Sequence, residues 1–145
     1  MRLIFQPVWI SRILIGLVLF FNVQCVLAFL IAPGLYAPGF ELSGAVGEGM
    51  VRGMGILFVM WNVPYAVAVS NPVRRRISLY EAAAMQGIGL VGETLLLATF
   101  PPGHPVVTAS IERFILFDGL GLLALLAAVR IVRSHERKRG STSRW

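Results

Sequence analysis

Six charged side chains lie in or beside strongly apolar stretches of the sequence, and they are the residues best placed to do chemistry. They are Glu48, Arg52, Glu93, Glu112, Arg113 and Asp118. A charge near the centre of a hydrocarbon layer costs about 2.5–3.5 kcal/mol on insertion scales, so such groups turn toward other protein groups and pair with them. A carboxylate held in this way can bind and release a proton, or it can hold the polar head of a ligand.

Four apolar segments must position these side chains. They cover residues 10–32, 48–70, 79–100 and 106–133, and each is long enough to cross a hydrocarbon core about 30 Å thick as a helix. The chain of 145 residues is 57% hydrophobic, which is too apolar for a soluble domain of this size. The sequence therefore predicts an all-α fold: a single domain over residues 1–145, built as an integral membrane four-helix bundle and ending in a short basic tail.

The basic residues predict how this bundle is oriented. Of the thirteen Lys and Arg residues, eleven lie near the two termini or in residues 71–76. The connections 33–49 and 101–110 contain none. Because Lys and Arg collect on the cytoplasmic side, both termini and residues 71–76 are expected in the cytoplasm, and the six charged side chains in the outer half of the membrane.

The second segment has a polar stripe and a helix breaker. Glu48, Arg52, Gly55, Val59 and Asn62 follow steps of four, three, four and three residues, which predicts one shared helix face. On this face Arg52 is expected to pair with Glu93 or Asp118 of another helix, and Glu48 is the competing partner four residues earlier. Pro64 removes a backbone donor near the middle of the segment, which predicts a kink.

Two other segments carry polar residues on a single face. In the third, Gln86, Gly89 and Glu93 share a face, and in the first, Asn22 and Cys25 do. A bundle turns such faces inward, because lipid offers polar groups no hydrogen-bond partner.

Two interpretations of the polar residues remain open. In the first, a ligand-binding pocket or proton relay opens toward the outside, and its candidate residues are Arg52, Asn62, Gln86, Glu93, Arg113 and Asp118. In the second, the arginines and acids neutralise one another and fix the positions of the helices. The outer half of the predicted bundle contains four carboxylates for two arginines, and Asn62 and Gln86 continue the polar residues toward the cytoplasmic side. Both observations favour the first interpretation.

Several other kinds of chemistry are not indicated. His104 and His135 are expected on opposite sides of the membrane, and Cys25 is the single cysteine, so neither a metal site nor a disulfide is predicted. The sequence implies no particular cofactor and contains no glycine-rich phosphate loop or nucleophilic triad. The basic residues 130–139 are expected to contact anionic lipid headgroups of the bilayer rather than nucleic acid.

The plan resembles the DoxX-like group of small four-helix bacterial membrane proteins. The similar parts are the first helix ending in Phe29-Leu30-Ile31-Ala32-Pro33, the sequence Val51-Arg52-Gly53-Met54-Gly55 opening the second, and the short basic connection after it. The resemblance covers most of the chain in layout, and it implies a bacterial inner-membrane protein. Members of this group are accessory subunits of membrane redox systems or have no assigned activity, so the resemblance carries over no catalytic residue.

Three functions follow as expectations. The first is a non-enzymatic accessory or ligand-binding subunit, within a larger membrane complex or a homo-oligomer. The second is a small transporter or proton-coupled carrier that acts as an oligomer. The third is a membrane enzyme acting on a lipid or quinone, for which the sequence shows no sufficient set of catalytic residues.

Overall fold

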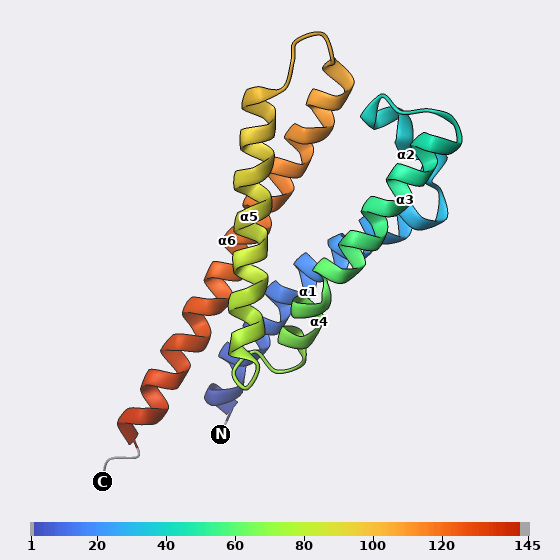
Figure 1. Ribbon diagram of the computed structural model, residues 1–145. Helices are drawn as coiled ribbons and strands as arrows, with labels where there is room; N and C mark the ends of the chain where they lie inside the picture. The colour runs from blue at the N-terminus through green and yellow to red at the C-terminus, as the bar shows by residue number, and fades with distance from the viewer. Residues whose placement is uncertain (1, 143–145) are drawn as a thin grey trace.

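The chain is all-helical in the part that the structure describes. This computed structural model describes the backbone of residues 2–142 and the side chains of residues 8–138, and no strand occurs among them (Figure 1). The elements are α1 (Arg2–Ile31), α2 (Pro33–Tyr36), the 3-10 helix η1 (Ala37–Phe40), α3 (Gly44–Trp61), α4 (Val63–Ser70), α5 (Arg76–Thr99) and α6 (Pro105–Thr142).

Four helical stretches of the described residues are long and apolar enough to cross a membrane. They are Val8–Ile31 of α1, Gly44–Ser70 formed by α3 and α4, all of α5, and Pro105–Lys138 of α6. These correspond to the four segments predicted from the sequence. The tail expected after residue 133 continues as helix to Thr142, because residues 134–139 include strong helix formers and no proline.

The second segment is divided where the sequence predicts a kink. α3 ends at Trp61 and α4 begins at Val63, with Pro64 in its first turn. At the junction, the side-chain amide of Asn62 donates to the carbonyl oxygen of Phe58 at 2.7 Å. Asn62 thus adds a side-chain hydrogen bond beside the break, while the carbonyl that loses its usual donor to Pro64 is that of Met60.

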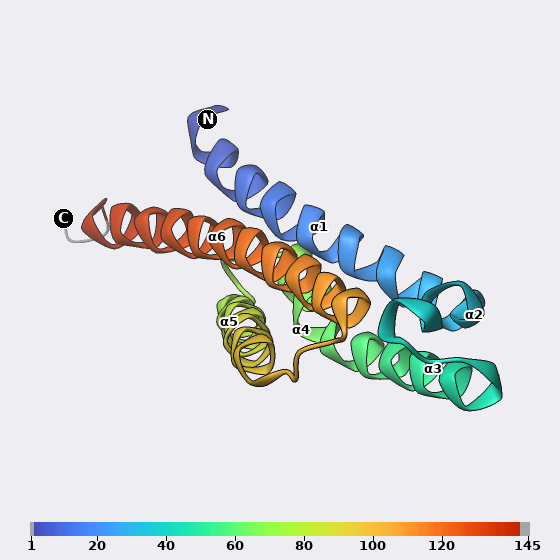
Figure 2. The same cartoon turned by 90° about the horizontal axis from the view of Figure 1, so that it is seen from above.

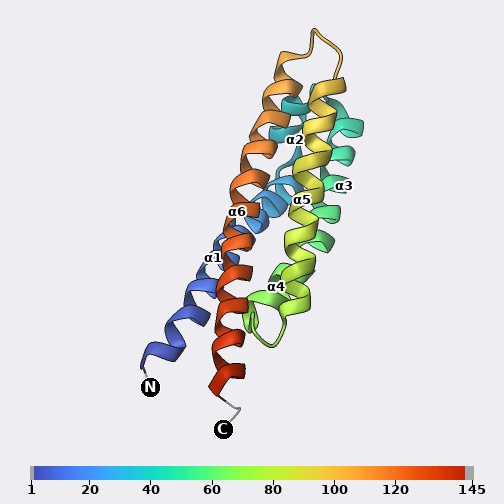
Figure 3. The ribbon, with the colours of Figure 1, turned by 90° about the vertical axis from the view of Figure 1, so that its left-hand side faces the viewer.

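Both termini and the connection of residues 71–75 lie at one end of the molecule, called the terminal end below (Figures 1 and 3). The short elements α2 and η1 and the connection of residues 100–104 lie at the opposite end, called the loop end (Figure 1). α5 packs against α6 and α4, and α1 packs against α6, α3 and α4. The backbone of α3 does not closely approach α5 or α6, although the rings of Phe58 and Phe114 meet, and the pair α1 and α3 diverges from the pair α5 and α6 toward the loop end (Figures 1 and 2).

The main apolar core fills the terminal end. Its largest fully buried members are Tyr65, Ile15, Leu79 and Leu125, which come from four different helices. Buried alanines from α4, α5 and α6 stand between them and let the backbones approach closely: Ala68, Ala82 and Ala128.

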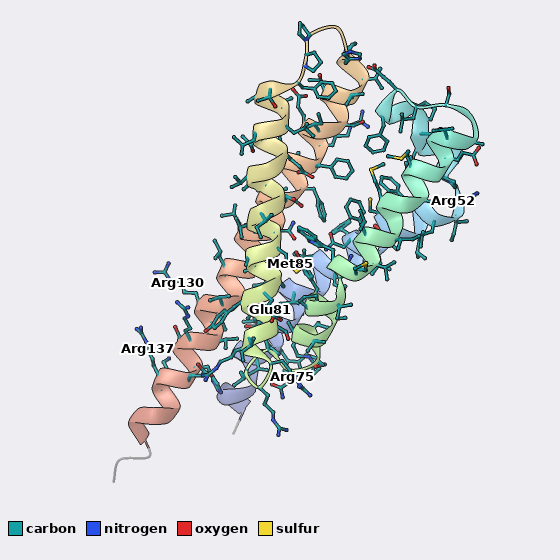
Figure 4. All side chains as sticks on the ribbon, viewed as in Figure 1. Arg52, Arg75, Glu81, Met85, Arg130 and Arg137 are labelled. Atoms are coloured by element: carbon teal, nitrogen blue, oxygen red, sulfur yellow. The ribbon has the colours of Figure 1, made fainter. Side chains whose placement is uncertain are left out.

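Arginines also join helix ends at the terminal end. Arg76 on α5 forms a 3.0 Å ion pair with Glu136 on α6, and Arg12 donates to the carbonyl oxygen of Val69 at 3.0 Å. Figure 4 shows Arg75, Arg130 and Arg137 gathered toward the same end.

The outward faces of the long helices are apolar. On α6 the side chains of Leu116, Leu120 and Leu123 are exposed, as are Ile56 and Leu57 on α3. Exposure of large apolar side chains along every long helix is unfavourable in water and favourable in lipid.

Candidate functional site

A chamber of about 610 Å³ lies between the diverging helices in the half of the molecule toward the loop end. Its lining residues fall within 21–29 of α1, 35–40 of α2 and η1, 58–62 at the end of α3 and its junction with α4, 89–93 of α5, and 110–118 of α6. The chamber exists because α1 and α6 hold α3 and α5 apart, so that side chains line the space between them without filling it.

Four phenylalanines from four elements form a closed ring in the chamber wall. Phe29 of α1 contacts Phe40 of η1 at 5.8 Å between ring centroids, and Phe58 of α3 at 5.9 Å. Phe114 of α6 completes the ring, at 6.2 Å from Phe40 and 6.3 Å from Phe58. These edge-to-face and stacked contacts make an apolar surface in the chamber wall.

A hydrogen-bonded chain leads from the chamber into the core. The amide nitrogen of Gln86 donates to Oδ1 of Asp118 at 2.8 Å. The hydroxyl of Tyr65 donates to the amide oxygen of the same Gln86, at 2.5 Å. Asp118 lines the chamber, whereas Gln86 and Tyr65 are fully buried, so the three side chains connect the chamber with the apolar core.

Two glycines, one on α5 and one on α6, each make room for a polar side chain of the opposite helix. A Cβ on Gly89 of α5 would collide with the carboxylate of Asp118 on α6. A Cβ on Gly121 of α6 would lie 2.6 Å from the amide nitrogen of Gln86 on α5. Each polar side chain therefore occupies a notch that the opposite helix leaves open, and a larger residue at either glycine would displace that side chain.

Three polar atoms of the chamber lining are buried and have no hydrogen-bond partner among the described residues. They are the amide nitrogen of Asn22, the amide oxygen of Asn62 and Oε2 of Glu93. Buried polar atoms are nearly always paired, so three such atoms around one cavity indicate that something else pairs with them.

The positively charged residues do not meet the carboxylates as predicted. Arg52 is not part of the chamber; it points away from α5 (Figure 4) and lies 3.8 Å from Glu48 on its own helix, with 55% of its side chain exposed. The prediction that Arg52 pairs with Glu93 or Asp118 is wrong. The buried face of α3 runs through Gly47, Val51 and Gly55, so Gly55 of the predicted stripe is buried whereas Arg52 and Val59 are exposed.

Arg113 does line the chamber, but its side chain is largely exposed. It forms no ion pair with Glu93 or Asp118 in the structure. Arg52 is thus paired with Glu48, whereas Glu93 and Asp118 have no arginine partner among the described residues, so the second interpretation holds for Glu48 and Arg52 and not for the two chamber carboxylates. The chamber brings together Asn62, Glu93, Arg113 and Asp118 of the six candidates, with Gln86 directly beneath.

The short elements α2 and η1 cover the loop end of the chamber and are fastened to α6. The hydroxyl of Ser110 donates to the carbonyl oxygen of Gly39 at 2.6 Å. Nδ1 of His104, just before α6, lies 2.6 Å from Oε2 of Glu41. The hydrogen bond from His104 lowers the pKa of Glu41 below its ordinary value.

The aromatic ring and Tyr65 were not among the candidates taken from the sequence. The four phenylalanines come from separate elements, and no spacing along the chain relates them. Asn22 and Cys25, which the sequence placed on one face of the first helix, do line the chamber together. Their three-residue spacing was the one signal for this wall.

The described residues contain no group of three His, Cys, Asp or Glu side chains that could hold a metal ion. Comparisons with protein-family models, curated proteins and solved structures found no match for this chain. Its function must therefore be argued from the chamber.

Proposed function

We propose that the chain is a multi-pass membrane protein that binds an amphiphilic molecule in the chamber without transforming it. It spans the bilayer four times with both termini in the cytoplasm, which places the chamber in the outer half of the membrane. The four long helices, their exposed apolar faces and the basic residues at the terminal end support this placement.

The observation that carries the proposal is the chamber lining. A ring of phenylalanines beside unpartnered polar atoms of Asn22, Asn62 and Glu93 suits a molecule with an apolar body and a polar head. A mostly apolar cavity with a few converging polar groups is the common form of a small-molecule site. The divergence of α3 and α5 offers such a molecule a route from the lipid.

Filling the chamber tests this function. Cys25 lines the chamber, whereas Val23, two residues away on α1, is exposed outside it. We expect Cys25→Trp to abolish retention of the bound amphiphile and Val23→Trp to preserve it. Native mass spectrometry of gently extracted protein measures this as a mass adduct. An unliganded parent protein, or equal adducts in both variants, would contradict the proposal, and the same spectra would reveal partner subunits or oligomers.

The orientation has its own test. In a Cys25→Ala background, a cysteine at Ser43, which is exposed between η1 and α3, should react with a membrane-impermeant maleimide in intact cells. A cysteine at Ser70, exposed at the end of α4, should react only after the membrane is permeabilised. Labelling of Ser70→Cys in intact cells would reverse the proposed orientation.

A proton-coupled carrier is the second candidate, because the chain from Asp118 through Gln86 to Tyr65 leads inward from the chamber. Transport also requires a path through the terminal end, which the structure shows tightly packed. Binding without transport therefore fits the geometry better. Proton flux in proteoliposomes that Asp118→Asn abolishes would favour the carrier instead.

A further inference from the structure

The chamber contains more negative than positive charge. Glu93 and Asp118 contribute two carboxylates, and Arg113 contributes the single guanidinium. Arg113 is exposed and lies five residues nearer the loop end than Asp118, which is about 7.5 Å along α6 at 1.5 Å per residue. Among the described residues, neither carboxylate has a cation within ion-pair distance. A cation bound between them would supply the missing charge.

The unpartnered acceptors define what that cation must offer. Asn62 lines the chamber but is only 7% exposed; its amide nitrogen already donates to Phe58, and its buried amide oxygen is an acceptor without a donor among the described residues. Glu93 presents a second buried acceptor, Oε2. A group that is both positively charged and a hydrogen-bond donor satisfies the two sites together, and a protonated amine is such a group.

The aromatic residues favour the same chemistry. Trp61 lines the chamber directly before Asn62, and Phe21 and Phe117 contact each other edge-to-face at 6.4 Å in another part of its wall. Aromatic faces attract cations electrostatically, and the attraction grows when water is excluded. A neutral polar head would gain less from these faces and from the carboxylates, because its hydrogen bonds are not charge-assisted.

We propose that the ligand is a lipophilic amine bound in its protonated form. Its nitrogen donates to Asn62 and Glu93, with Asp118 as the second countercharge, and its apolar body lies against the phenylalanine ring. An oxygen beside the nitrogen would accept from the amide nitrogen of Asn22, the remaining unpartnered atom. This inference rests on the proposed function, because it names the class of molecule that the chamber binds.

A matched pair of fluorescent probes tests the charge requirement. Monodansylcadaverine carries a primary amine, and its N-acetyl derivative has the same apolar body without the charge. Both are titrated against the full-length protein in phosphatidylcholine nanodiscs, with empty nanodiscs subtracted. We expect the amine to bind at least about tenfold more tightly, because only the amine meets the unpaired carboxylates.

Three isosteric variants locate the effect. Glu93→Gln and Asp118→Asn should each weaken amine binding about tenfold and leave the neutral probe almost unchanged. Glu112→Gln is the control: this carboxylate is exposed on the same helix as Asp118 and lies outside the chamber, so affinity should stay within about twofold. Gel filtration confirms that each variant is folded.

The outcomes separate the inference from the proposed function. Equal affinity of the two probes for the parent would overturn the amine and leave a chamber for neutral amphiphiles. Binding of neither probe would overturn both. Amine binding that survives both Glu93→Gln and Asp118→Asn would place the cation elsewhere and overturn the site. If either variant does not fold, the affinities of the two probes for the parent protein and for the other variant still test the inference.

Discussion

The two halves of this molecule pack the same four helical segments in opposite ways. At the terminal end, alanines and fully buried Leu79 and Leu125 bring the helices into close contact. Toward the loop end the helices diverge, and large aromatic rings line an open chamber instead of filling a core. The difference indicates that stability is concentrated at the terminal end, which leaves the chamber free to hold polar groups that packing alone does not satisfy.

The break between α3 and α4 lies between the closely packed half and the open half. α4 packs against α1 and α5 in the closely packed half, whereas α3 packs against α1 and diverges from α5. Pro64 supplies the change of direction, and Asn62 at the same point belongs to the chamber. The interruption that opens the bundle thus also presents a polar group to the space that it creates.

The largest expected effect is on stability, and it compares the shortening of one side chain in each half of the molecule. Leu125→Ala removes a fully buried side chain from the core and should lower the free energy of unfolding by about 2–3 kcal/mol, through lost packing. Phe114→Leu in the chamber wall should cost about 1 kcal/mol or less, since it borders space that is already open. Unfolding in mixed micelles with increasing sodium dodecyl sulfate measures both. A chamber variant as destabilising as the core variant would remove the distinction.

A smaller loss of stability is expected from a glycine substitution at the point where the two halves meet. Gly121→Ala pushes a methyl group against the amide of Gln86, breaks its hydrogen bonds to Asp118 and Tyr65, and should cost about 1–2 kcal/mol. Gly92→Ala is the control, because nothing lies within 4 Å of the added Cβ. It should leave stability equal or higher.

A double-mutant cycle confirms the cause. In a Gln86→Ala background the methyl group has no amide to displace, so Gly121→Ala should then be almost neutral. The same loss in both backgrounds would mean that Gly121 serves the packing of the helix backbones rather than the hydrogen-bonded chain.

The sequence was sufficient for the features that depend on one helix at a time. Long apolar runs predicted the four segments, Pro64 predicted the break, and the spacing of Gln86, Gly89 and Glu93 predicted their shared inward face. Each of these follows from helix length or helix period alone.

Features that depend on how helices meet could not be predicted. Gly55 packs against Leu30 and Phe29 of α1. In this orientation of α3 Val51 is buried, and Arg52, the next residue, points about 100° away from Val51. The aromatic ring requires four elements at once, and the chamber requires that α3 and α5 separate. Neither condition leaves a local pattern in the sequence.

The smallest expected effect concerns the cover of the chamber and its response to acid. Glu41 has a lowered pKa in the folded state because His104 donates to it, so this contact stabilises the fold at pH values above the ordinary pKa of 4.5. The stabilisation is lost as the pH falls through the lowered value. Acidification should therefore increase hydrogen exchange in residues 37–42, after correction for intrinsic rates. The increase should be modest, because the Ser110–Gly39 hydrogen bond does not titrate and keeps η1 on α6. Glu41→Gln should exchange faster at neutral pH and show no further response to acid. If parent and variant respond alike, the contact with His104 does not fasten the cover, and the wall of the chamber holds it in place instead.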